Sequence, residues 1–218
     1  MCGRKYASEE LTWAEYRDIL DITGPPRNLQ PSYNIAPTQE YYVCTEQDGK
    51  RELRPMRWWL VPHWAKELSS KYPSFNAKAE TLEQKQSFKG LVKSNRAVVM
   101  VSGFYEWKRE GSDKQPYRVE HPKGEPMLFP ALWTYNKHLD VYSYTIITTA
   151  PSEGFKWLHH RQAAILPPEQ AGSWLSGPWE QAKRLMAPYE GELNFIPVSK
   201  EVGKVQNNYP ALLEPVSL

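Results

Sequence analysis

Cys2 has the most distinctive chemical potential in this chain, because it directly follows the initiator methionine. A small side chain at this position favours removal of Met1, which would leave Cys2 with a free α-amine beside its thiol. The amine titrates near physiological pH, so part of it is a neutral nucleophile that can form an imine with an aldehyde. The thiol can then close a five-membered thiazolidine ring in a step that proximity favours. An internal cysteine cannot do this, although a structural or neutral Cys2 is the alternative.

Imine formation also needs groups that move protons, because the carbinolamine must lose water. Three segments supply candidates: SFNAKAETL with Asn76, Lys78 and Glu80, GFYEW with Glu106, and WLHHRQAAIL with His159, His160 and Arg161. Taken singly, such residues are usually solvated or structural, but the aromatic setting of Glu106 favours burial.

The composition is that of an ordinary globular protein of 218 residues, with 40% hydrophobic and 24% charged residues. No apolar run reaches the roughly 18 residues of a membrane span, and no signal peptide is recognisable, so we expect a cytoplasmic protein. Cys2 and Cys44 are too few for a disulfide framework or a cysteine metal site, and we expect no cofactor and no metal. The net charge of +2 does not indicate a nucleic-acid binder, but nine tryptophans allow stacking platforms.

The elements that must position these residues are mostly short strands. We expect helices over residues 8–20, capped by Ser8, and 166–177, an extended loop over 24–39, and strands at YYVCT, at 56–60, from 96 and from 141. Nineteen prolines and the lack of a βαβ rhythm predict one α+β domain over residues 1–218, with a mostly antiparallel, barrel-like sheet. We expect the last residues, about ten, to pack on the body or fray.

Six motifs occur in one order: MCGR, YNIAPTQ, MRWWLVPHWAK, NAKAETL, GFYEW and HHRQAAIL. With this combination the chain resembles the SRAP family (SOS response-associated peptidase-like proteins), which processes abasic sites in DNA, over nearly its whole length. The resemblance implies the SRAP fold, an α+β domain with a bifurcated or pseudo-barrel sheet and a few peripheral helices.

The resemblance also implies roles for four residues. Cys2, exposed by loss of Met1, would form a thiazolidine crosslink with the ring-opened aldehyde of an abasic site in single-stranded DNA. Asn76 would position Cys2 near the sugar, and Glu106 would move protons at the amine and the sugar oxygen. His159, the first residue of an H-x-R motif, would promote ring opening and reversal of the crosslink. The crosslink would shield the site from strand cleavage during the DNA damage response, and a transient lyase activity would pass through the same imine.

Phosphate contacts and stacking should supply the grip on DNA. The candidates are Arg4, Lys78 and Arg161 for phosphates and Trp64 for stacking or as a wedge, with core packing as the alternative for Trp64. The expected partners are single-stranded DNA containing abasic sites and single-strand/double-strand junctions. We expect no membrane partner, and a monomer.

Three positions depart from the family pattern. Lys78 stands where the family usually has arginine, which removes the bidentate phosphate geometry. Trp59 replaces a glycine, and Ala163 follows the H-x-R motif where proline is common. These departures concern DNA contacts and not the proposed chemistry.

Two other functions remain open at this point. In a thiol peptidase, or one that cleaves only its own leader, Cys2 would be the nucleophile, with His159 as base and Asn76 or Glu106 orienting it. In a noncatalytic module that binds single-stranded DNA, Cys2 would be structural.

Overall fold

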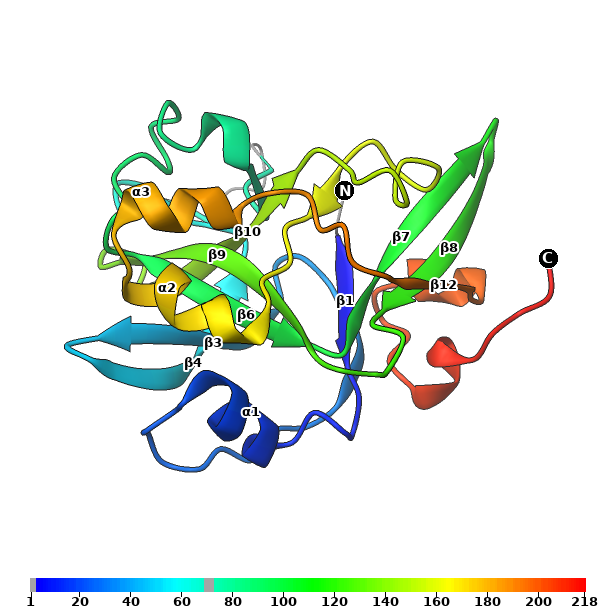
Figure 1. Cartoon of the computed structure of the whole chain (residues 1–218), viewed down its shortest axis with the longest axis horizontal. Coiled ribbons are helices and arrows are strands. Elements are labelled where there is room, and N and C mark those ends of the chain that lie inside the picture. Colours follow the sequence, from blue (N-terminus) through cyan, green and yellow to red (C-terminus); the bar gives the residue numbers. More distant parts are fainter. Residues whose placement is uncertain (1–2, 69–72) are drawn as a thin grey trace.

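Strands dominate the computed structural model, which describes residues 3–68 and 73–218 (Figure 1). The strands are β1 (Arg4–Ala7), β2 (Ser32–Ile35), β3 (Glu40–Gln47), β4 (Lys50–Trp58), β5 (Asn76–Lys78), β6 (Arg96–Val101), β7 (Gly103–Glu110), β8 (Asp113–Glu120), β9 (Met127–Asn136), β10 (Val141–Thr149), β11 (Gln162–Ala163) and β12 (Asn194–Pro197). The α-helices are α1 (Trp13–Leu20), α2 (Ala171–Ser176) and α3 (Trp179–Ala182). The described residues also form five short 3-10 helices: η1 (Ala79–Thr81), η2 (Pro168–Gln170), η3 (Lys183–Leu185), η4 (Lys200–Gly203) and η5 (Pro210–Leu213).

Five strands close into a barrel in the order β10, β4, β3, β6, β9 and back to β10. All of these pairings are antiparallel except that of β10 with β4, which is parallel. The short strands β5 and β11 also pair with β10, the first parallel and the second antiparallel, so the segment that follows β5 and the loop that precedes β11 reach the same end of β10. The α+β fold with a mostly antiparallel, pseudo-barrel sheet is therefore confirmed.

A second, wholly antiparallel sheet has the order β12-β8-β7-β1-β2. In Figure 1 its strands β7, β8 and β12 lie to one side of the barrel, and β1 runs between them and the barrel strands. β1 begins beside Tyr105, with the register Arg4↔Tyr105 and Lys5↔Phe104.

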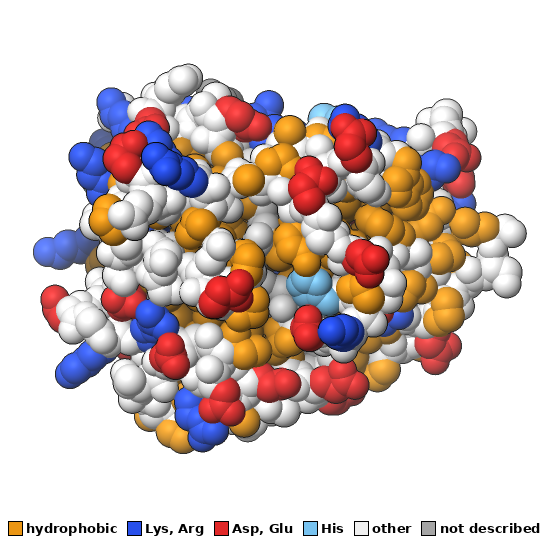
Figure 2. All heavy atoms as spheres, in the orientation of Figure 1, with side chains coloured by type: hydrophobic (Ala, Val, Ile, Leu, Met, Phe, Trp, Pro, Cys, Tyr) orange, Lys and Arg blue, Asp and Glu red, His pale blue; other side chains and the backbone are white. Residues whose placement is uncertain are grey.

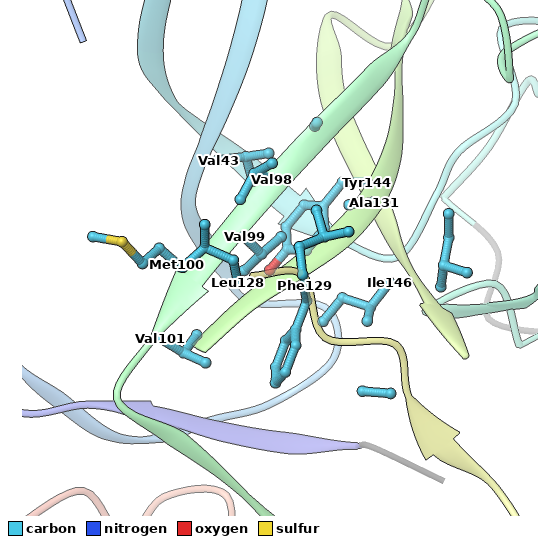
Figure 3. Packing of buried hydrophobic residues seen from close by; sticks show 14 of the residues in the cluster. Val43, Val98, Val99, Met100, Val101, Leu128, Phe129, Ala131, Tyr144 and Ile146 are labelled. Atoms are coloured by element: carbon cyan, nitrogen blue, oxygen red, sulfur yellow. The ribbon is translucent and has the colours of Figure 1, made fainter. Parts of the chain in front are cut away.

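The main core fills the barrel and extends under the second sheet. Figure 3 shows side chains of β6 and β9, among them Val99 and Phe129, packed against Tyr144 and Ile146 of β10. These residues are fully buried, and burial of each such side chain contributes about 1.5–3 kcal/mol. The continuous apolar run of β6 fits a strand that is buried on both faces.

Lys5 is a fully buried cation in this otherwise apolar region. Its Nζ donates to the hydroxyl of Tyr144 at 2.8 Å and lies 3.8 Å from the ring centroid of Trp58 and 4.6 Å from that of Tyr41. Aromatic faces stabilise a cation that has been removed from water. This contact fixes β1 against the barrel.

The first helix is shorter than its sequence pattern predicts. It begins at Trp13 with Thr12 as its N-cap, whose backbone N–H donates to Glu15. Ser8 does not cap it, because the Ser8 hydroxyl hydrogen-bonds with that of Ser102 at 3.1 Å. Glu9 accepts a hydrogen bond from the Tyr33 hydroxyl. Tertiary contacts have therefore taken up the polar groups that were expected to start the helix.

The segment that begins at residue 96 contains two strands in place of the single one expected. β6 belongs to the barrel and β7 to the second sheet, and only Ser102 separates them. The loop over residues 24–39 is extended, as expected, but it also contains β2. Near the C-terminus, Leu212 of η5 is buried and Pro215 forms a bridge with Val198.

None of the helices formed by the described residues has the length and apolar character of a membrane span.

Candidate functional site

A cleft of about 950 Å³ opens where β7 and β8 meet the loop between β10 and β11. Among the described residues that line it, the charged or titratable ones are Arg4, Glu106, Lys108, Arg109, Lys114, Lys156, His159 and His160. Five of these are permanent cations and one is a carboxylate, so the cleft favours an anionic ligand. The sequence candidates Arg4, Glu106 and His159 thus lie together although they are distant in the chain.

Glu106 comes from the middle of β7, where it pairs with Tyr117 of β8. Its side chain is 3% exposed, and Oε1 accepts a hydrogen bond from the backbone N–H of Trp107 at 3.2 Å. Burial raises the pKa of Glu106, because the charged form is poorly solvated there. A carboxyl group with a raised pKa can hold a proton and release it, which suits a general acid or a proton shuttle.

His159 lies in the loop that leads into β11. The backbone N–H of Arg161 donates to its Nδ1 at 3.0 Å, and the carbonyl oxygen of Arg161 lies 3.1 Å from the same atom. Burial lowers the pKa of His159 to about 4, and the nearby charges of His160 and Arg109 act in the same direction. The imidazole is therefore neutral at physiological pH and can accept a proton.

Arg161 connects this histidine to η1 and β10. Its guanidinium forms a bidentate ion pair with Glu80, with N–O distances of 2.7 and 3.0 Å, and donates to the carbonyl oxygen of Thr148 at 2.8 Å. The same residue thus orients His159 through its backbone and ties the loop to β10 through its side chain. The ion pair also lowers the pKa of Glu80.

Arg4 is held at the edge of the cleft by acceptors from distant parts of the chain. Its Nη1 donates to Asn34 Oδ1 at 2.9 Å and to the carbonyl oxygen of Val202 at 2.7 Å, and Nη2 donates to that of Gly203 at 3.3 Å. The guanidinium carbon lies 5.9 Å from the ring centroid of Trp107. These contacts fix the start of β1 beside Glu106.

The remaining sequence candidates lie outside this lining. Asn76 and Lys78 belong to β5 and pair with Ile146 and Thr148 of β10, so they share the β10 region with Arg161. Trp64 is 48% exposed and lines a different cavity of about 600 Å³. Their roles in binding or catalysis stay predictions.

The structure also shows the surroundings of Trp59 and Ala163, the other two departures from the family pattern. The ring of Trp59 lies 5.3 Å from that of Phe75, which is a packing contact. Ala163 is fully buried in β11, opposite Thr148.

The two cysteines differ in what the structure says of them. Cys2 lies outside the described residues. Cys44 is fully buried on β3, and burial raises the pKa of its thiol to about 12. A thiol in this state is not a nucleophile at physiological pH.

Several residues of the cleft were not singled out in the sequence. They are Trp107, Lys108, Arg109, Lys114, Lys156 and Trp157. Lys108 carried a usable signal, because it stands two residues after Glu106 and side chains at that spacing share one face of a strand. The others reach the cleft through the β7–β8 hairpin and the loop before β11, which the sequence pattern does not place.

Figure 2 shows hydrophobic side chains gathered over the right of its face, where Figure 1 places β8 and β12.

Comparisons with known proteins agree with this architecture. The abasic site processing protein YoqW of Bacillus subtilis (strain 168) is 32% identical over 228 residues, which cover 98% of this chain and 99% of the relative. The abasic site processing protein HMCES of Gallus gallus is 34% identical over 265 residues, covering 100% of this chain and 79% of the relative. A crystal structure of a protein from Bordetella bronchiseptica superimposes with a TM-score of 0.78 at 21% identity, covering 91% of this chain and 100% of that one, and shows the shared fold.

The family model described as SOS response associated peptidase (SRAP) matches residues 1–205. The match spans both sheets, the cleft and all the candidate residues. The chain therefore belongs to the SRAP family.

Proposed function

We propose that this protein processes abasic sites in DNA, and that it does so by forming a covalent thiazolidine crosslink between Cys2 and the abasic aldehyde in single-stranded DNA. The proposal rests on the names of the relatives, which are abasic site processing proteins, and on the chemistry open to an N-terminal cysteine. The observation that carries it is the cleft, in which a buried Glu106 with a raised pKa and a neutral His159 lie at the start of β1.

Each chemical step has a group of the required type. Opening of the deoxyribose ring needs a base for the anomeric hydroxyl and an acid for the ring oxygen, and neutral His159 and buried Glu106, whose pKa is raised, suit these two roles. The α-amine of Cys2 then adds to the aldehyde, and the carbinolamine accepts a proton and loses water to give the imine. Addition of the thiol to the imine carbon closes the ring, so the net reaction releases one water. If the thiol does not add, the same imine permits a lyase reaction.

The cations of the cleft give the proposal its substrate class. Lys108, Arg109 and Lys114 lie on the β7–β8 hairpin, beside the proposed reaction centre. Phosphate contacts of this kind carry no base readout, which suits a substrate that has lost its base. We propose that the protein acts as a monomer on single-stranded DNA and at single-strand/double-strand junctions, and that binding weakens as salt rises.

The first experiment is the intact mass of the purified protein, before and after incubation with single-stranded DNA that contains one abasic site. The expected result is a protein that lacks Met1 and a denaturant-stable adduct heavier by the DNA mass minus one water. The Cys2→Ala variant should form no such adduct, whereas the matched control Cys44→Ser should crosslink like the wild type, because Cys44 is buried and protonated.

Equal crosslinking by Cys2→Ala and the wild type would refute the proposal. A protein that lacks Met1 but forms no adduct would also refute it, and would favour a thiol peptidase or a noncatalytic binding module. If Met1 is retained, it is removed with methionine aminopeptidase before the comparison is made.

A further inference from the structure

We infer that Trp157 is a stacking platform for one unpaired nucleobase of the DNA strand that enters the cleft. The inference rests on the proposed function, because it assumes that single-stranded DNA occupies this cleft. It adds a binding subsite for the base of a nucleotide near the abasic one.

Trp157 is exposed, whereas the apolar side chains of Phe155 and Leu158 beside it are buried. It lies in the loop between β10 and β11, two residues before His159 and in the lining of the same cleft. Phe155 and Leu158 of this loop are buried at 0% and 4% exposure, whereas Trp157 is 44% exposed. The loop is therefore anchored in the core while it presents a large aromatic surface beside the reaction centre.

The indole ring is already fixed by two other aromatic rings. Tyr117 of β8 lies 5.1 Å away, centroid to centroid, at an interplanar angle of 88°. Phe195 of β12 lies 5.3 Å away at 73°. A ring that is held in advance loses little rotamer freedom when a ligand stacks on it. The geometry thus favours recognition of a flat partner over a purely structural role for the exposed part of the ring.

The charges around Trp157 favour a nucleic acid as the source of that flat partner. The Nζ of Lys108 lies 5.6 Å from the centroid of the indole ring, and Arg109 and Lys114 line the same cleft. Lys108 and Lys156 form ion pairs with Glu110 and Glu153. These carboxylates are 69% and 84% exposed, and such surface pairs are weak enough for phosphates to replace them.

An abasic nucleotide creates a particular need for such a subsite. It offers no base to stack or hydrogen-bond, so the adjoining nucleotides must supply the contacts that hold the strand in register. Stacking on an aromatic ring is tolerant of sequence, because every base has a π-face. A single platform close to His159 therefore serves abasic sites in any sequence context.

The test is the equilibrium binding of a short fluorescent oligothymidylate, which contains no abasic aldehyde, measured by anisotropy. Trp157→Leu should raise the Kd about ten-fold, within the range found when a stacking residue is removed, and Trp157→Phe should retain most of the affinity. The matched control is Tyr135→Leu, because Tyr135 is also exposed but lies outside the cleft. Thermal unfolding of each variant verifies that it is folded.

A second measurement locates the stacked base. Single bases of the oligonucleotide are replaced in turn by a tetrahydrofuran spacer, which cannot form an imine. In the wild type, one position should cost about as much affinity as Trp157→Leu does. In Trp157→Leu the same replacement should cost nothing further, because the stacking contact is already absent. An unchanged Kd for Trp157→Leu, or the same positional profile in both proteins, would overturn the inference.

This inference and the proposed function fail in different ways. Binding of undamaged DNA needs no Cys2 chemistry, so it is measured in the Cys2→Ala background as well. If the wild type forms no crosslink but Trp157→Leu still weakens binding at one base position, the proposed function fails and the stacking platform stands. If crosslinking occurs as expected but Trp157→Leu binds like the wild type, the platform fails alone.

Discussion

Replacement of Glu80 by glutamine removes the charge that holds the Arg161 side chain against η1. Glu80 accepts two hydrogen bonds from the Arg161 guanidinium, at 2.7 and 3.0 Å, and its side chain is 50% exposed while that of Arg161 is 12% exposed. Hydrogen bonds to charged groups contribute about 1.5–3 kcal/mol each when shielded from water. Solvent screens a half-exposed carboxylate, so we expect Glu80→Gln to lower the free energy of unfolding by only about 1 kcal/mol.

The loss should depend on pH in a direction that follows from the pKa of Glu80. The hydrogen bonds from Arg161 lower this pKa in the folded protein. A carboxylate of this kind contributes its stability above its unfolded-state pKa and loses it as the pH falls through the folded-state pKa. The difference between the wild type and Glu80→Gln should therefore be complete at neutral pH and shrink in acid.

The assays are urea denaturation of both proteins over a series of pH values and thermal unfolding at neutral pH. A loss of about 1 kcal/mol corresponds to a decrease in Tm of roughly 2–4 °C for a chain of this size. The matched control is Glu153→Gln, whose partner Lys156 is also exposed, and which should leave stability almost unchanged. Because the backbone of Arg161 also orients His159, Glu80→Gln should in addition slow crosslinking.

Two results would refute this reasoning. Equal stability of Glu80→Gln and the wild type at neutral pH would mean that the ion pair contributes nothing. A difference that persists unchanged in acid would mean that the charge of Glu80 is not its source.

Three further experiments test other parts of the structure. His159→Gln should slow crosslinking about 10²–10⁴-fold. The factor should be constant from about pH 5 to 8, because the wild-type imidazole is neutral down to its pKa of about 4. A factor that changes near pH 6.5 in rate measurements would contradict this. Gly103→Ala should destabilise the fold by about 2 kcal/mol or more, since the new Cβ would lie 2.5 Å from a backbone oxygen of β8. The control Gly90→Ala should not destabilise the fold, because its Cβ would have nothing within 4 Å. Equal melting temperatures for the two variants would refute the packing argument. Cys44 should resist alkylation in the native protein because its thiol is buried with a pKa of about 12, and rapid labelling by iodoacetamide, seen by mass spectrometry, would show that β3 opens readily.

Local patterns in the sequence were enough to predict the fold class, and they favoured burial of Glu106. The strand-length apolar run of β6 and the β-branched residues of β10 predict buried strands, and both lie in the barrel. The aromatic residues on either side of Glu106 predict a setting that is poor in water, and its raised pKa agrees.

Features that depend on contacts between residues distant in the chain could not be predicted from the sequence. Nothing local distinguishes β6 and β7 as members of different sheets, because both read as strand. The ion pair of Arg161 with Glu80 joins residues 81 positions apart in the chain, and the expected phosphate contact of Arg161 stays a prediction. From its residue type alone, Trp157 would be expected in the core. Its exposure depends on how its loop packs against Tyr117 of β8 and Phe195 of β12, which are distant in the chain.

The single residue between β6 and β7 has a consequence for how the molecule opens. Ser102 joins the barrel to the second sheet, and its backbone N–H donates to the carbonyl oxygen of Tyr6 in β1 at 3.0 Å. β7, which contributes Glu106 to the cleft, is thus a direct continuation of the core strand β6. Amide protons in the first half of β7 should exchange with solvent only on global unfolding, as those of β6 do, whereas the loop that carries His159 and the tip of the hairpin can exchange through smaller fluctuations. We therefore expect the strand that carries Glu106 to open only with the whole fold, and the loop that carries His159 to open at a lower free energy.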